Sequence, residues 1–214
     1  MQSTTRRLYA ADMFMPAFQQ WPTEAGIIAR LLGGYGELEL ELALCLGHAI
    51  SDKRKGIRDF FATRGETARI RLASVQAGPW MRATGIGDEF ARTLVGVRAC
   101  KDIRNSLSHC HWASLKHNQP SDGLFYVNLE KSAAASTGAA PIVYQWRHAT
   151  LPWLQDCEAY YRYASDCLRH VQGRMAAQRG QPSSASFIMP PRRKPPAVFV
   201  PVSADSLARL PKEF

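Results

Sequence analysis

The residues best suited to chemistry in this chain lie in one short stretch, residues 104–109, with the sequence RNSLSH. The guanidinium of Arg104 offers planar donors that can bind two phosphate oxygens at once. The imidazole of His109 has an ordinary pKa of about 6.5, so it can take up and return a proton near neutral pH. A cation and a titratable base of this kind suit the cleavage of a phosphodiester without a metal ion.

The spacing within this stretch indicates which side chains can act together on a helix. Five residues turn an ideal helix by about 140°, so Arg104 and His109 do not share a face. Asn105 lies four residues before His109, and its amide is expected to hold the imidazole in one orientation. Ser108 lies four residues after Arg104 and is expected to offer its hydroxyl to the phosphate. A twofold dimer would place two copies of the stretch around one cleft and supply both an acid and a base.

The order Arg-Asn-x-x-x-His resembles the signature of the HEPN-domain ribonucleases, in which a histidine follows an arginine after four to six residues. The helical pattern from about Glu24 to Gln178 is similar to the helical bundle of that family. The resemblance implies a homodimeric endoribonuclease that needs no metal or other cofactor and leaves 2′,3′-cyclic phosphate ends. It implies that Arg104 and His109 are catalytic, that Asn105 supports them, and that the protein acts as a toxin or in phage defence.

One toxin branch of this family carries a tyrosine two positions after the histidine, where a partner antitoxin modifies it. This chain has His111 at that position, which argues against that form of regulation. The imidazole of His111 is expected to support catalysis as a further acid or base. An antitoxin or regulatory protein of another kind remains a possible partner under the resemblance.

The charge of the chain favours an anionic partner, with RNA as the leading candidate. The formal net charge is +9 and the isoelectric point is about 9.6. The most basic stretch of the body contains Arg54, Lys55 and Arg58, and Lys101 precedes the motif. We expect these four residues to contact RNA, although the same charges would also suit a solvated helix face.

Long helices are expected to position the motif, because apolar residues recur at intervals of three and four residues. These helices are predicted at about 24–48, 53–77, 89–112 and 151–178. The second is expected to end at Gly78-Pro79, and the motif lies near the end of the third. Glu37, Glu39 and Glu41 in the first helix are interpreted as a solvated face. The predicted fold class is therefore all-α, and the family resemblance implies an antiparallel HEPN-like bundle.

Composition divides the chain into three parts. Residues 1–23 form an N-terminal arm, and residues 24–179 form the helical domain. Within that domain, alternating apolar residues at 123–130 and 141–146 predict a small inserted β-hairpin at about 122–148. Residues 180–214 form a proline-rich tail that is expected to be extended or disordered and able to dock on the body or on a partner.

Several classes of protein are disfavoured by the sequence. The five cysteines contain no CxxC pair, which indicates reduced thiols, and Cys45, Cys100 and Cys157 are expected in the core. A metal site built from His109, Cys110, His111 and His117 is improbable, because the spacing of the ligands is not that of known zinc sites. No apolar run approaches the roughly 20 residues of a membrane span, and no secretion signal is present, so a cytoplasmic location is expected.

The motif also has plainer interpretations. Arg104 would pair with a nearby carboxylate on the surface, and His109 would satisfy the last carbonyls of its helix. The chain would then be a non-catalytic module that binds RNA or protein, or a dimerisation domain. Catalysis requires Arg104 and His109 to reach one accessible cleft, and burial of His109 among apolar residues would exclude it.

Overall fold

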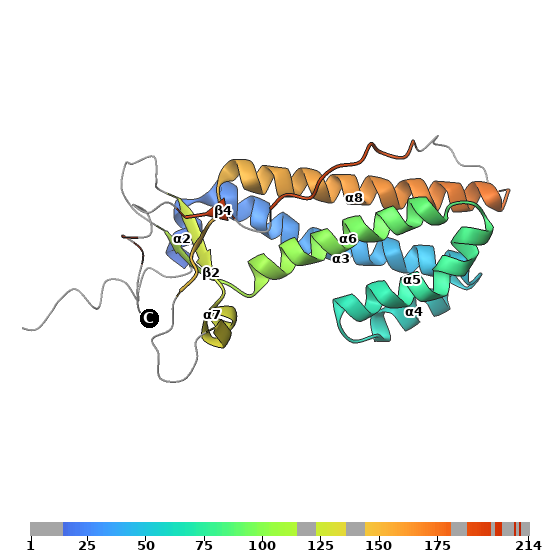
Figure 1. The fold of residues 1–214 in the computed structure, drawn as a ribbon, viewed down its shortest axis with the longest axis horizontal. Coiled ribbons are helices and arrows are strands. Elements are labelled where there is room, and N and C mark those ends of the chain that lie inside the picture. The colour runs from blue at the N-terminus through green and yellow to red at the C-terminus, as the bar shows by residue number, and fades with distance from the viewer. Residues whose placement is uncertain are drawn as a thin grey trace, which may run out of the picture. The chain divides into compact units, whose positions relative to one another are not determined.

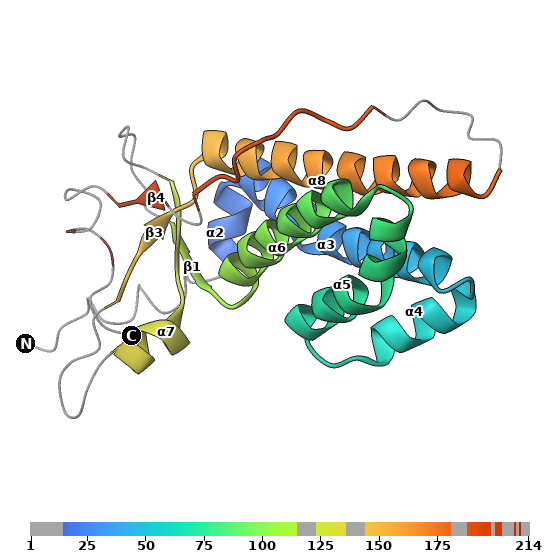
Figure 2. The ribbon, with the colours of Figure 1, turned by 45° about the vertical axis from the view of Figure 1, so that its right-hand side comes forward.

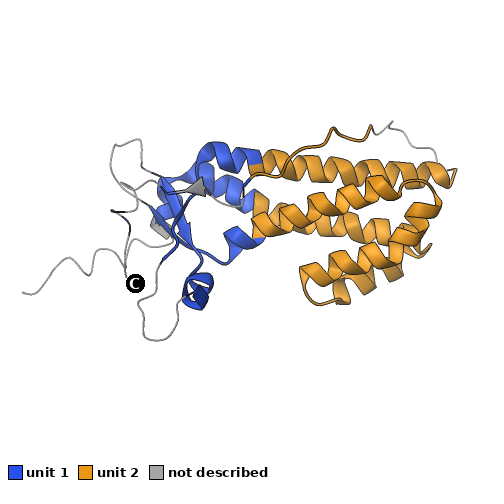
Figure 3. Ribbon diagram, viewed as in Figure 1, with its two compact units in different colours: residues 1–30, 105–156, 197–214 blue, residues 31–104, 157–196 orange. Residues whose placement is uncertain are grey.

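The computed structural model describes residues 15–114, 123–135, 144–180, 188–197, 200–202, 208 and 210. These residues are mostly helical, with a small antiparallel sheet (Figure 1). The chain divides into two compact units (Figure 3). Unit 1 comprises residues 1–30, 105–156 and 197–214, and unit 2 comprises residues 31–104 and 157–196.

Three long helices contribute residues to both units: α3 (Pro22–Ala49), α6 (Gly87–Ser108) and α8 (Leu151–Gln178). Unit 2 adds the shorter helices α4 (Lys53–Ala62) and α5 (Glu66–Ala83). Within unit 2, α8 contacts both other long helices, because the Tyr161 hydroxyl donates to the Cys100 carbonyl of α6 at 2.8 Å and the Tyr161 ring reaches Gly34 of α3. Helix α8 therefore packs against both α3 and α6 in unit 2.

Glycines allow α4 to turn back closely on the end of α3. A Cβ atom on Gly56 would lie 2.3 Å from the Cα of Gly47, so neither position has room for a side chain without moving backbone. The connection between the two helices contains Ser51 with a φ of 60°, in the left-handed region. Asp52 then begins α4, and its side chain accepts a hydrogen bond from the Lys55 backbone amide at 2.9 Å.

Unit 1 contains a four-stranded antiparallel sheet with the order β1-β2-β3-β4. Its strands are β1 (His111–Ser114), β2 (Leu124–Val127), β3 (Arg147–His148) and β4 (Val200–Pro201). Helix α2 (Met15–Gln20) and helix α7 (Leu129–Ala135) belong to the same unit (Figure 2). Trp112 pairs with Tyr126 across β1 and β2, and the centroids of the two rings lie 5.2 Å apart. Aromatic packing therefore holds this sheet.

Two of the predicted helices are confirmed closely by the structure. The predicted helix 151–178 coincides with α8, and the predicted helix 24–48 lies within α3. Gly33, Gly34 and Gly36 do not divide α3 into two pieces. Packing of the long apolar face of α3 stabilises the helix by more than its glycines destabilise it.

The predicted helix at 53–77 is wrong at its middle and at its end. It is broken before α5 at Gly65, whose φ of 85° favours glycine. Helix α5 then continues past Gly78-Pro79 to Ala83, with Pro79 inside it. The buried face that includes Ala77 and Met81 runs through the proline, so packing offsets the missing backbone hydrogen bond.

The third predicted helix ends earlier than expected. Helix α6 ends at Ser108, and the next residues form β1 instead of continuing to Trp112. The reason is tertiary, since burial of the Trp112 ring between Phe18 and Tyr126 requires the extended strand. The motif thus lies at the point where a helix gives way to a sheet.

The predicted hairpin is confirmed only as an antiparallel pairing within 122–148, where Phe125 and Tyr126 pair with His148 and Arg147. Its second strand lies at 147–148, whereas residues 144–146 are not in a strand and residues 141–143 lie outside the described part. Residues 129–135 form α7 instead of continuing the first strand. Of the proline-rich tail, residues 188–197 form no helix or strand, and residues 200–201 add the unexpected strand β4.

Candidate functional site

The motif begins in one unit and ends in the other. Arg104 belongs to unit 2, whereas Asn105, Ser108 and His109 belong to unit 1. All but His109 lie on α6, which ends at Ser108. The shared cleft of Arg104 and His109 therefore stays a prediction, and the surroundings of each residue are described within its own unit.

Arg104 is held by a carboxylate of unit 2. Its Nη1 atom lies 3.0 Å from Oε1 of Glu66 on α5, and about a third of its side chain, 32%, is exposed. This ion pair is the plainer interpretation of Arg104 that the sequence also allowed. It does not prevent phosphate binding, because a guanidinium carries several N–H donors and the carboxylate fixes its orientation.

The charge of Arg104 affects the pKa values of two buried tyrosines, Tyr35 and Tyr161. Burial raises the pKa of Tyr35 and of Tyr161, and the positive charge of Arg104 opposes that increase at both. At Tyr35, the charges of Glu39 and Glu66 raise the pKa further. The Tyr35 hydroxyl is buried and has no hydrogen-bond partner within the described residues. Arg104 thus lies in a partly desolvated surrounding, where its charge acts more strongly than in water.

His109 follows directly after α6 and is exposed. The condition that would have excluded catalysis, burial of this imidazole among apolar residues, is therefore not met. His111 begins β1 and is exposed as well. The imidazoles of His109 and His111 are thus accessible from solvent, as proton transfer to a bound substrate requires.

The other polar residues of the motif are less accessible. Asn105 is half-buried. The Ser108 hydroxyl is buried, with no hydrogen-bond partner among the described residues. Its direct contact with a phosphate would require the end of α6 to open, and this role stays a prediction.

The cysteine beside His109 is not a nucleophile in this arrangement. The Cys110 thiol donates a hydrogen bond to the carbonyl oxygen of Ser106 near the end of α6. Burial raises its pKa to about 12, so the thiol is neutral near pH 7. Cys45, Cys100 and Cys157 are buried free thiols, which confirms their assignment to the core. Among the residues that the structure describes, no group of three potential metal ligands is present, and His117 lies outside them.

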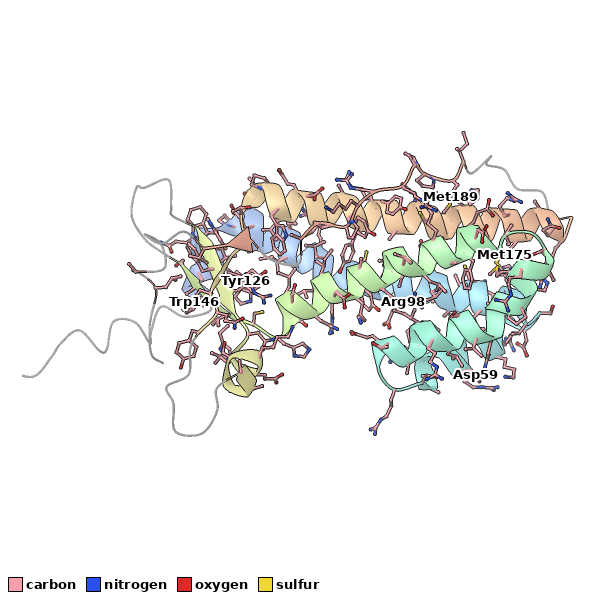
Figure 4. All side chains as sticks on the ribbon, in the orientation of Figure 1. Asp59, Arg98, Tyr126, Trp146, Met175 and Met189 are labelled. Carbon is pink, nitrogen blue, oxygen red and sulfur yellow. The ribbon has the colours of Figure 1, made fainter. Side chains whose placement is uncertain are left out.

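The residues expected to bind RNA fall into two environments. Arg54, Lys55 and Arg58 are exposed on α4. Lys55 forms an ion pair with Asp59, which is labelled in Figure 4, and Arg58 lies 3.5 Å from the same carboxylate. The hydrogen bond from Lys55 lowers the pKa of Asp59. The α4 residues therefore form an accessible cationic surface with one carboxylate beside it.

Lys101 differs from the α4 cations because its side chain is only 18% exposed. Its Nζ atom lies 3.1 Å from Asp102 and donates to the Thr67 hydroxyl at 3.3 Å. A role for Lys101 in RNA binding stays a prediction, but these contacts favour a local structural role.

Two features of unit 2 were not predicted from the sequence. One is Glu66, the partner of Arg104; its position at the start of a basic helix gave no indication of that contact. The other is a cavity of about 460 Å³ lined by α6, α8 and the C-terminal segment. The adjacent arginines of that segment, Arg192 and Arg193, are evident in the sequence. Nothing in the sequence indicated which helices they would contact.

The chain has no significant match among protein families, curated proteins or solved structures. The likeness to HEPN ribonucleases therefore depends on the motif and on the helical pattern alone. Within the described part of the chain, no helix combines the length and apolar character needed to cross a bilayer.

Proposed function

We propose that this protein is a metal-independent endoribonuclease of HEPN type that acts as a homodimer in the cytoplasm, as a toxin or in phage defence. The observation that carries the proposal is the environment of the motif. His109 is exposed at the end of α6, and Arg104, five residues earlier, is oriented by Glu66. An accessible base and an oriented cation are the two groups that such a reaction needs most.

In the proposed reaction, the ribose 2′-oxygen attacks the adjacent phosphorus and the bond to the 5′-oxygen breaks. His109 of one copy takes the proton from the 2′-hydroxyl, and His109 of the second copy gives a proton to the departing 5′-oxygen. The products are a 2′,3′-cyclic phosphate and a 5′-hydroxyl. This step therefore consumes no water molecule, and it needs no metal ion. Arg104 binds the non-bridging oxygens and stabilises their charge in the transition state.

The remaining residues of the motif have supporting roles in this proposal. Asn105, four residues before His109, orients the imidazole. His111 serves as a second acid or base, and Ser108 reaches the phosphate only when the end of α6 opens. The exposed cations of α4 supply non-specific attraction for the RNA backbone.

The test compares cleavage of a mixed RNA substrate, in EDTA, by the wild type and by single variants. Loss of proton transfer in His109→Ala should reduce the rate by about 10²–10⁴-fold. Arg104→Ala should reduce it by roughly 10²–10³-fold, as expected for the loss of one group that stabilises transition-state charge. Arg98→Ala is the matched control, because Arg98 is an exposed arginine of the same helix outside the motif (Figure 4).

Folding and oligomeric state should be checked for each variant, and the products should carry 2′,3′-cyclic phosphate ends. Equal cleavage by all proteins would refute the assignment of the site to this motif. RNA binding without cleavage by the wild type would favour a non-catalytic RNA-binding module instead. The exposed cations on α4 are the observation that favours this second function.

A further inference from the structure

The C-terminal segment 188–196 closes a cavity against two helices of unit 2. It runs beside α8 in both views of the ribbon, where it is drawn in red-orange (Figures 1 and 2). The cavity has a volume of about 460 Å³ and is open to solvent on one side. Its wall is shared by residues of α6, of α8 and of the segment.

Arg92 ties the three walls together. Its Nε atom donates to the Tyr163 hydroxyl at 3.1 Å, and its guanidinium lies 5.8 Å from the centroid of the Tyr163 ring. Another nitrogen of the same guanidinium donates to the Pro190 carbonyl oxygen of the segment. Helices α6 and α8 also pack against each other beside the cavity, since a Cβ atom on Gly96 would lie at an ordinary contact distance of 3.6 Å from the Ala164 Cβ. The cavity is therefore preformed, which lowers the entropic cost of binding.

The charge of the lining selects an anion. The lining contains three guanidinium groups, those of Arg92, Arg192 and Arg193, and one carboxylate, that of Asp88, so its formal charge is +2. Such a surplus matches the dianion of a phosphate monoester, and arginine forms paired hydrogen bonds to phosphate oxygens. Arg192 and Arg193 are both exposed, so an incoming anion can reach them without unfolding the segment.

The apolar part of the lining favours a ligand that also has an apolar part. Val95, Pro195 and the ring of Tyr163 provide apolar surface beside the arginines. A volume of this size, mostly apolar with a few fixed polar groups, is typical of sites for small organic molecules. Inorganic phosphate alone would leave the apolar part of the cavity unused.

We propose that this cavity binds a small organic phosphate, with its phosphate on Arg192 and Arg193 and its flat apolar body against Val95 and Tyr163. The site lies entirely within unit 2 and contains no residue of the motif. It is therefore independent of the proposed ribonuclease activity. A nucleotide and a simple aryl phosphate share the required chemistry, and the experiment separates these two sources.

The test is calorimetric titration of the full chain with three probes: adenosine monophosphate, phenyl phosphate and inorganic phosphate. At least one organic phosphate should bind with one-to-one stoichiometry and at least about tenfold more tightly than inorganic phosphate. Similar affinities for the two organic probes indicate an aryl phosphate site, and a preference for adenosine monophosphate indicates a nucleotide site.

A double variant, Arg192→Gln with Arg193→Gln, should lower the affinity by about tenfold or more, which corresponds to about 1.4 kcal/mol. Both side chains are exposed in an extended segment, so folding should be unaffected. The matched control is Arg98→Gln with Arg162→Gln, which removes the same charge from exposed positions of α6 and α8 outside the cavity. This control should bind as the wild type does.

A second measurement locates the ligand on the wild type. Trypsin should cleave after Arg192 and Arg193, and the organic phosphate that binds should slow this cleavage several-fold. Three outcomes overturn the proposal: neither organic phosphate binds more tightly than inorganic phosphate, the Arg192/Arg193 variant binds as well as the wild type, or the bound ligand leaves the tryptic cleavage rate unchanged.

Discussion

The two units of this protein are stabilised by different interactions. Unit 2 places charged side chains between its helices and pairs them there. Unit 1 packs aromatic rings around a small sheet. This difference determines which substitutions each unit tolerates, because a buried ion pair fails when one partner is removed, whereas an aromatic core fails when volume is removed.

Some of the charge pairs of unit 2 connect different helices. Arg69 of α5 contacts both carboxylate oxygens of Glu39 of α3, at 3.1 and 3.0 Å. Glu89 of α6 lies 3.1 Å from Arg174 and 3.3 Å from His170, both on α8. Charged side chains therefore link α3 to α5 and α6 to α8 in this unit, in addition to the apolar residues of its core.

Unit 1 instead relies on rings and apolar side chains. Phe125 and Trp146 belong to one buried cluster together with Ala113, Val127 and Leu210. On a neighbouring part of the sheet, the Tyr126 ring lies 5.2 Å from Trp112 and 6.1 Å from Trp153. Since sheets this small are marginal without such packing, we expect the stability of unit 1 to depend strongly on these rings.

The largest expected effect is the loss of an aromatic ring from the sheet. Phe125 is completely buried, so Phe125→Ala should lower the free energy of unfolding by about 3–5 kcal/mol. Urea denaturation followed by circular dichroism measures this loss. Phe61→Ala is the matched control in unit 2, where the ring is 41% exposed and a smaller loss is expected. Equal losses in the two variants would contradict the view that the sheet depends on its buried rings.

A smaller effect is expected when an ion pair of unit 2 loses its charge. Glu39→Gln should cost about 2 kcal/mol, because the Arg69 guanidinium then lacks its charged acceptor while remaining partly desolvated. Glu37→Gln should change the free energy of unfolding by less than about 0.5 kcal/mol, since Glu37 is exposed on the same helix. The same urea experiment measures both. If the two variants are equally stable, the Glu39–Arg69 pair does not stabilise unit 2.

These two glutamates also illustrate what the sequence could predict. Helical periodicity was sufficient to place α3 and α8, because their apolar residues repeat over many turns. The same pattern could not distinguish Glu39, which is 7% exposed, from the exposed Glu37. The difference depends on Arg69, thirty residues further along the chain, and a contact of that range leaves no local signal.

The motif shows the same limit. Its helix and its position near the helix end were predictable from the sequence, but the end itself at Ser108 was not. That end depends on Trp112, which pairs with Tyr126 in the sheet. The partner of Arg104, the burial of the Ser108 hydroxyl and the strand at 200–201 all depend on contacts between distant segments. Local propensity therefore located the motif but could not describe its surroundings.

The smallest of the three effects on stability concerns a histidine that is packed among the rings of unit 1. His148 stacks on Phe125 with ring centroids 4.5 Å apart, and burial lowers its pKa. Near pH 7 the imidazole is neutral in both the folded and the unfolded chain. As the pH falls through about 6.5, the unfolded chain takes up the proton first, so the free energy of unfolding decreases until the folded pKa is passed.

Replacing His148 by phenylalanine keeps a ring against Phe125 but removes this titration. Urea midpoints measured between about pH 5 and 8 should therefore fall less steeply with decreasing pH in His148→Phe than in the wild type. Part of the slope should remain in the variant, because burial and the nearby charges of Arg179 and Lys53 lower the pKa of His48 in unit 2. Parallel pH profiles for the two proteins would mean that protonating His148 costs the sheet nothing. In that case a protonated His148 would stack on Phe125 as well as a neutral one does, and the aromatic packing of unit 1 would not disfavour the charge.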